Sequence, residues 1–157
     1  MHINKMNILG VALVALLALT DVSAHGQAKG IVLDRHNLMV DIRDANKVIR
    51  NMVRAKAPLD RGKLKEQSAL IVERSRSMMK MFPDTKASRH GKGSNAKQTI
   101  WSDWTGFSQW NDRMGERAAK LGDMAASATL EELKAQHGQL GKTCSGCHKA
   151  FRTKKGL

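Results

Sequence analysis

The clearest pattern in the chain is the stretch TLEELKAQHGQLGKTCSGCHKAFRTK, residues 129–154. It opens on Thr129-x-x-Glu132, the capping-box signature of a helix N-terminus. Residues suited to one buried helix face then recur every three or four positions, which is the period of an amphipathic helix. These positions are Leu130, Leu133, His137, Leu140, Cys144, Cys147 and Phe151. The pattern predicts one long helix over residues 129–154.

Three upstream segments, residues 29–56, 60–82 and 99–122, show the same helical period. Asp60 is a candidate N-cap for the second of them. Short links join the first pair and the last pair of segments, while the polar residues 83–98 connect the two pairs. The expected core positions are Leu38, Ile42, Ala45, Ile49, Met52, Leu64, Ile71, Val72, Met78, Met79, Ile100, Trp104, Phe107, Asn111, Met114, Ala118 and Leu121. No segment has the two-residue period of a strand, so we predict an all-α antiparallel four-helix bundle.

The composition fits one globular domain. The chain has 157 residues, of which 41% are hydrophobic and 26% charged. Two cysteines are too few for a disulfide-dense scaffold. The net charge of +13 favours an anionic partner. No block of five or six like charges occurs, however, so the charge indicates a solvated basic surface, and nucleic-acid binding is not expected.

The N-terminus has the three parts of a secretory signal peptide. Lys5 precedes a nearly continuous apolar run over residues 6–19, and Val22-Ser23-Ala24 supplies small residues at a cleavage site. The run is shorter than the roughly 20 residues that a membrane-spanning helix needs. We therefore expect cleavage of residues 1–24, export to the periplasm, and a mature domain of residues 25–157 without a membrane span.

Both cysteines of the chain belong to the motif Cys144-Ser145-Gly146-Cys147-His148. The motif C-x-x-C-H is the attachment signal of haem c, in which each thiol forms a thioether bond with a haem vinyl group. On a helix this spacing puts both sulfur atoms on one face. His148 shares that face, so its ring nitrogen is a candidate axial ligand of the iron. The sequence predicts one covalent haem c, and a large apolar cofactor in the core accounts for an aromatic content of only 4%.

Two other uses of these cysteines are a redox dithiol and half of a zinc site. A thioredoxin-like dithiol favours a βαβ context, which the helical pattern lacks. A zinc ion needs a fourth ligand from another histidine or a carboxylate. Only nine residues follow His148. A sixth iron ligand is therefore expected from upstream, or not at all.

An exported four-helix bundle with this motif near its C-terminus resembles the class II c-type cytochromes, which comprise cytochrome c′ and its low-spin relatives. The resemblance covers the whole mature chain and includes local matches beside the haem motif. They are Arg35-x-x-x-Met39, Ile100-Trp101 with Phe107, Gly141-Lys142-Thr143, and His148-x-x-Phe151-Arg152. The resemblance implies a haem held near the C-terminal end of the bundle. It also implies a homodimer formed through the first two helices.

The same resemblance suggests roles around the haem. Arg35 would lie near a haem propionate or gate the distal pocket. Met39 would ligate the iron through its thioether, cover the distal face without bonding, or simply pack in the core. Trp101 and Phe107 are expected to line the haem pocket. Arg152, one turn past His148, is expected near the proximal face.

Two further histidines were considered as iron ligands. His36, beside Arg35, is either a competing sixth ligand or a surface residue. His137 lies about 16 Å along the helix from His148, so both cannot bind one iron, and we expect it at the edge of the core.

Two functions follow from the two states of Met39. With Met39 bound, a low-spin haem suits an electron carrier whose basic surface steers it to an acidic redox protein. With Met39 unbound, a five-coordinate haem would bind nitric oxide or carbon monoxide. The sequence analysis favours electron transfer. Enzymatic activity such as that of a peroxidase is not expected. It would need a histidine and an arginine together on the distal side of the haem, and His36 and Arg35 are the one pair that could take this role.

Overall fold

The structure, a computed structural model, describes residues 28–153, so the predicted leader lies outside the described residues. The four long helices are α1 (Ile31–Val53), α2 (Arg61–Met78), α5 (Trp104–Met124) and α6 (Leu130–Phe151). Shorter elements are the 3-10 turn η2 (Met79–Met81), α3 (Lys86–His90) and α4 (Thr99–Ser102). Within residues 28–153 there is no strand, and no helix is long and apolar enough to cross a membrane.

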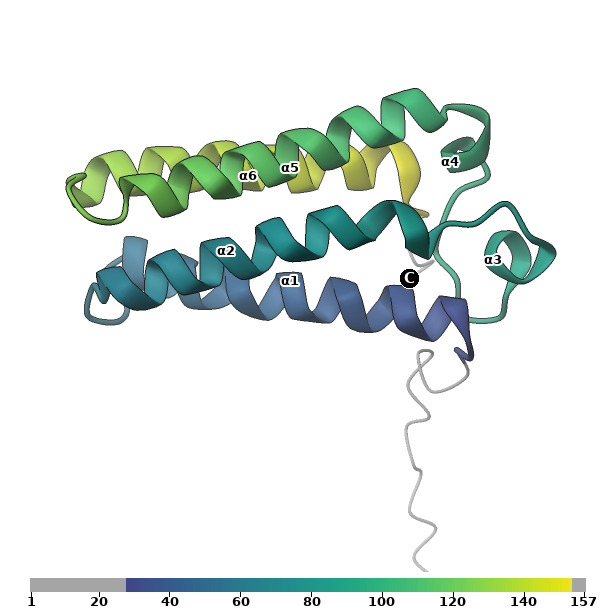
Figure 1. Ribbon diagram of the computed structural model, residues 1–157, viewed down its shortest axis with the longest axis horizontal. Coiled ribbons are helices and arrows are strands. Elements are labelled where there is room, and N and C mark those ends of the chain that lie inside the picture. The colour runs from purple at the N-terminus through teal and green to yellow at the C-terminus, as the bar shows by residue number, and fades with distance from the viewer. Residues whose placement is uncertain (1–27, 154–157) are drawn as a thin grey trace, which may run out of the picture.

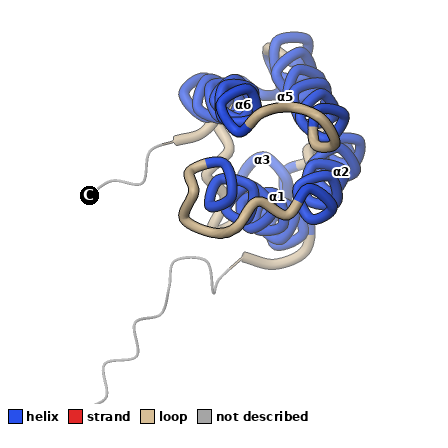
Figure 2. Tube along the Cα trace, turned by 90° about the vertical axis from the view of Figure 1, so that its left-hand side faces the viewer, coloured by secondary structure: helices blue, strands red, loops and turns tan. Residues whose placement is uncertain are grey.

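The long helices form an antiparallel bundle, as predicted. Helices α1 and α2 make one hairpin and α5 and α6 make the other; all four run along the long axis, and one hairpin lies beside the other (Figure 1). Helix α2 packs most extensively against α5, whereas α1 and α6 contact each other far less. Figure 2 shows the four helices around a common axis. Helices α3 and α4 and the end of α6 lie together at one end of the bundle (Figure 1).

The two predicted helix starts are confirmed by their hydrogen bonds. The Asp60 side chain accepts a hydrogen bond from the backbone N–H of Lys63 at 2.8 Å. At the start of α6, Thr129 and Glu132 form the reciprocal capping box. Such caps satisfy backbone N–H groups that have no partner within the helix.

Most of the predicted core positions are buried, but Trp104 is not. Its side chain is 41% exposed, so the expectation that it packs in the general core is wrong. The cause is a break in the third predicted helix at Asp103, whose backbone leaves the helical region (φ −126°, ψ 58°). The Asp103 carboxylate accepts a hydrogen bond from the N–H of Gly106 at 3.0 Å and so starts a new helix. Trp104 is thereby the first residue of α5, at the end of the bundle, with the centroid of the Phe107 ring 5.9 Å from its own.

Helices α2 and α5 approach closely because small residues face each other at two places seven residues apart. A Cβ atom on Gly115 would lie 2.7 Å from the Ser75 Oγ. A Cβ atom on Gly122 would lie 3.3 Å from the Ser68 Cβ. The Ser75 hydroxyl donates to the Val72 carbonyl at 2.7 Å, so it is not free to turn away without losing that bond. Larger residues at these positions would therefore push the two helices apart.

We predict that Gly115→Val lowers the free energy of unfolding by about 1–3 kcal/mol, the usual cost of an overpacked core. The control is Gly138→Ala, because a Cβ atom there meets nothing within 4 Å. This control should raise stability by up to about 1 kcal/mol through helix propensity alone. Urea unfolding of the haem-loaded proteins measures both. Equal stability of Gly115→Val and the wild type would contradict the close-packing argument.

Candidate haem site

A cavity of about 410 Å³ opens between α1, the 91–97 loop and the end of α6. Its apolar lining comprises Val32, Met39, Val40, Ile42, Phe82, Ala96, Ile100, Phe107 and Phe151. Its basic and polar lining comprises Arg35, His36, Arg43, Asn46, Ser94, Asn95, His148 and Arg152. No acidic side chain of the described residues lines it. The combination suits a large apolar ligand that carries negative charge at its edge.

The C-x-x-C-H motif lies at this cavity. Cys144 and His148, one helical turn apart on α6, both line it. Cys147 is half-buried and packs against the hydrophobic core. Burial raises the pKa of the Cys144 thiol, and burial with the neighbouring Cys144 raises the pKa of Cys147 to about 11. The two cysteines are therefore neutral thiols at pH 7.

His148 lies at the rim of the cavity. Partial burial, with a smaller contribution from the positive charge of Arg152, lowers the pKa of its imidazole. The ring is therefore neutral at pH 7, which is the form that can donate a nitrogen lone pair to a metal. Arg152 itself is exposed and also lines the cavity.

The glycine of the motif has a specific packing role. A Cβ atom on Gly146 would collide with the indole ring of Trp110, coming within 2.6 Å of its Cζ3. Trp110 on α5 thus packs directly on the backbone of the motif. The guanidinium carbon of Arg113 lies 4.3 Å from the centroid of the same ring. The sequence analysis missed this contact, because Gly146 and Trp110 are 36 positions apart.

Arg35 is buried at the cavity wall and ties a long loop to α1. Its Nε donates to the Met81 carbonyl at 3.1 Å, and its Nη1 donates to the Ser94 hydroxyl at 3.2 Å. Its Nη2 donates to the Ser88 hydroxyl at 2.8 Å. The guanidinium carbon also lies 4.1 Å from the ring centroid of Phe82. Burial lowers the Arg35 pKa to about 10, so the side chain is still a cation at pH 7.

Met39 and Phe107 both lie on the cavity wall. Met39 is half-buried and one turn beyond Arg35 on α1. Phe107 makes edge-on contacts with Phe82 (4.8 Å between centroids) and Phe151 (5.4 Å). These aromatic rings close the α5 side of the cavity.

Trp101 does not line the cavity and lies one layer behind it. Its indole N–H donates to the Phe82 carbonyl at 3.1 Å. The guanidinium carbons of two cations lie near the ring, at 5.9 Å (Arg35) and 5.2 Å (Arg89) from its centroid. In this position Trp101 supports Arg35 and Phe82, which themselves form the wall.

The structure pairs His137 with a cavity residue that the sequence analysis did not single out. His137 is buried, as expected for the edge of the core, and its Nε2 lies 3.0 Å from the Asn46 Oδ1. Burial, together with Arg54 and Arg50, lowers the His137 pKa. Asn46 lines the cavity but stands beside the predicted core position Ala45, so periodicity alone gave no reason to select it.

The 91–97 loop forms a strap along the end of α6. The Lys97 N–H donates to the Phe151 carbonyl at 2.9 Å, and the Thr153 N–H donates to the Asn95 carbonyl at 2.9 Å. Ala96 and Arg152 form an isolated antiparallel bridge. The sequence analysis treated this loop as a polar connection, because its pairing depends on residues more than 50 positions away.

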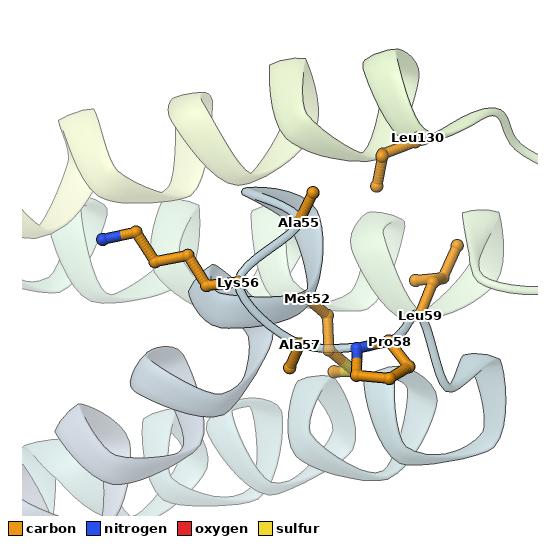
Figure 3. A pocket seen from close by; sticks show the side chains of 7 residues that line it. All are labelled: Met52, Ala55, Lys56, Ala57, Pro58, Leu59 and Leu130. Carbon is orange, nitrogen blue, oxygen red and sulfur yellow. The ribbon is translucent and has the colours of Figure 1, made fainter.

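A second hollow, of about 430 Å³, lies at the opposite end of the bundle (Figure 3). It is lined by Met52, Ala55, Lys56, Ala57, Pro58, Leu59 and Leu130. Its lining holds no thiol, imidazole or carboxylate. Among residues 28–153, moreover, no three side chains of His, Cys, Asp or Glu are grouped so as to hold a metal ion. The zinc alternative for the two cysteines therefore has no ligand set within this range.

The chain is similar to known proteins of one family. The protein-family model described as cytochrome c′ matches residues 30–152. Cytochrome c′ of Rubrivivax gelatinosus is 33% identical over 104 residues, which cover 66% of this chain and 78% of that protein. The crystal structure of cytochrome c′ from the same organism has a TM-score of 0.69 at 27% identity, covering 78% of this chain and 94% of that one.

A third comparison is with the nitric oxide complex of a variant of cytochrome c′ from Alcaligenes xylosoxidans. The TM-score is 0.69 at 25% identity, and the match covers 79% of this chain and 94% of that one. The family match extends over all four long helices and the strap. This chain therefore belongs to the cytochrome c′ family, class II c-type cytochromes that carry one covalently bound haem c in a four-helix bundle.

Proposed function

We propose that this chain is an exported cytochrome c′ whose five-coordinate haem binds nitric oxide or carbon monoxide. The observation that carries the proposal is the similarity to cytochrome c′ over residues 30–152, which includes a relative solved with nitric oxide bound. The site described above is compatible with it, because one wall of the cavity carries the attachment motif and another carries apolar side chains.

Three residues of α6 would hold the cofactor. The Cys144 and Cys147 sulfurs would form the thioether bonds, and His148 would supply the axial nitrogen from its neutral ring. Arg35 would offer its remaining Nη1 hydrogen to a propionate while its other donors hold the loop. When bound, the haem supplies the iron at which a diatomic gas binds.

Met39 would act as a lid in this proposal. It lies on the α1 wall of the same cavity whose α6 wall carries His148. Its neighbours on that wall include the apolar Val40 and Ile42. A flexible thioether side chain in such surroundings fills space and yields to a small ligand without breaking a strong bond. Gas would then bind only after the Met39 side chain moves aside.

Electron transfer is the alternative, and it depends on Met39 as a sixth ligand. The comparisons support gas binding better, because a cytochrome c′ of similar fold has been solved with nitric oxide. The proposal assigns no catalytic residue. Export through cleavage of residues 1–24 and a homodimer through α1 and α2 belong to the same proposal.

We predict that the oxidised, purified mature protein has a broad high-spin absorption spectrum. The dithionite-reduced protein should shift on addition of nitric oxide or carbon monoxide, because the sixth position accepts a ligand. Absorption spectra before and after each addition measure this. Sharp low-spin bands that do not respond to nitric oxide would overturn gas binding and support the electron carrier.

We also predict that Met39→Ala binds carbon monoxide about five- to tenfold faster. A half-buried methionine gains about 1 kcal/mol from its contacts, and this energy no longer opposes entry. Stopped-flow mixing of the reduced protein with carbon monoxide measures the rate. The matched control is Met124→Ala, a half-buried methionine of α5 that packs on the core but does not line the cavity. It should leave the rate unchanged.

The same variant tests ligation. If Met39 only covers the distal face, the ferric spectrum is high-spin in both the wild type and Met39→Ala. A change from low-spin to high-spin on substitution would instead identify Met39 as the sixth ligand.

A further inference from the structure

The charge of the chain is unevenly distributed in space. Residues 85–102 and residues 133–153 contain basic side chains but no aspartate or glutamate. The fold joins these two acid-free segments at the haem end. The Lys97 N–H bonds to the Phe151 carbonyl, and the Thr153 N–H bonds to the Asn95 carbonyl. The basic surface expected from composition is therefore concentrated where the strap meets α6.

Four cations define this basic face: Lys97, Lys142, Lys149 and Arg152. Lys142 and Lys149 are exposed and lie seven positions apart on α6, so they share one side of the helix. Arg152, also exposed, is the first residue beyond α6 and pairs with Ala96 of the strap. The Lys97 ammonium donates to the Lys149 carbonyl at 2.9 Å, which places it at the end of the same stripe. The four charges therefore come from α6, from the residue that follows it and from the strap.

Like most basic side chains of residues 28–153, the cations of the basic face have no acidic partner. None of them forms an ion pair with a carboxylate in the described part of the chain. Five basic residues elsewhere do pair with acidic neighbours. They are Arg43 with Asp44, Lys63 with Glu66, Arg74 with Asp41, Arg89 with Asp84, and Lys134 with Glu131. The charge of the basic face is thus uncompensated within the protein and remains available to an anionic surface.

The basic face meets the haem cavity at Arg152 and the strap. Arg152 belongs to both, and the strap residues Asn95 and Ala96 also line the cavity. A macromolecule that contacts Arg152 and the strap would therefore stand beside the cavity.

We infer that the basic face docks an acidic one-electron donor protein, which reduces the haem so that gas can bind. This inference rests on the proposed function, because carbon monoxide binds ferrous and not ferric haem. One electron passes from the donor to the ferric iron, the donor is oxidised by one electron, and no proton or group is transferred. Electrostatic complementarity between the two surfaces would raise the rate of encounter.

A protein partner fits the basic face better than a lipid surface does. Segments that lie on membranes combine basic residues with exposed apolar side chains that enter the bilayer. The large exposed hydrophobic residues of the described chain are Leu33 and Trp104. Neither belongs to the basic face, which therefore has positive charge but no large exposed apolar side chain that could enter a bilayer.

The test is the rate at which reduced flavodoxin, an acidic one-electron donor used as a probe, reduces the ferric protein in stopped flow. For the wild type the rate should fall about tenfold as ionic strength rises from roughly 10 mM to roughly 200 mM. The double variant Lys142→Glu/Lys149→Glu should be about tenfold slower at low salt. A wild-type rate that does not depend on salt would overturn the inference without need of any variant.

The matched control is Lys65→Glu/Lys120→Glu, which changes the net charge equally on exposed sites of α2 and α5. The control variant should retain most of the wild-type reduction rate. If both double variants lose the same fraction of the rate, the effect depends on net charge alone and the inference is overturned. Haem content and urea unfolding confirm that each variant is intact.

A lipid surface is the alternative occupant. If both double variants are reduced at the same rate, and only the wild type binds vesicles of phosphatidylglycerol, the basic face is assigned to lipid instead. The spectra with nitric oxide test the proposed function separately, since a low-spin protein could still show salt-dependent reduction.

Discussion

The buried guanidinium of Arg35 is the constraint on which the haem end depends. A cation removed from water must have its N–H groups satisfied, and no carboxylate among residues 28–153 pairs with it. Oxygen atoms of Met81, Ser88 and Ser94 take that role. Leaving one such donor unsatisfied in the interior costs about 1–3 kcal/mol. The segment between α2 and Ser94 therefore stays folded against α1, although its only regular elements are η2 and α3.

The second half of the same loop completes the arrangement. Beyond Ser94 the chain pairs with the end of α6 through Lys97 and Asn95. Three segments that are distant in sequence thus meet around one cavity: the start of α1, the strap and the attachment motif. Because α1 and α6 pack loosely on each other, space remains between them for a large cofactor. The closely packed α2 and α5, held together at Gly115 and Gly122, provide the rigid side of the bundle.

Features that depend on local sequence could be predicted, and those that depend on distant contacts could not. The helical period, the caps at Asp60 and Thr129, and the C-x-x-C-H motif are local, and all were recognised. The break at Asp103 was missed because a carboxylate cap competes with helix continuation, and this competition moved Trp104 to the surface. The partners of Arg35 and the bond between Asn46 and His137 join residues 46 to 91 positions apart, where periodicity carries no information. The resemblance to a family placed Arg35 at the cavity but not its hydrogen bonds.

The two functions considered for this protein differ by a single bond. The attachment motif, the neutral ring of His148, the aromatic wall and the basic face serve an electron carrier and a gas-binding protein equally well. Both need one axial nitrogen, and both need an electron to enter at the haem edge. The fold and the charge pattern therefore do not distinguish them. What distinguishes them is whether the Met39 sulfur binds iron or only occupies space. A bound thioether closes the sixth position, whereas an unbound one leaves a site whose access depends on one flexible side chain.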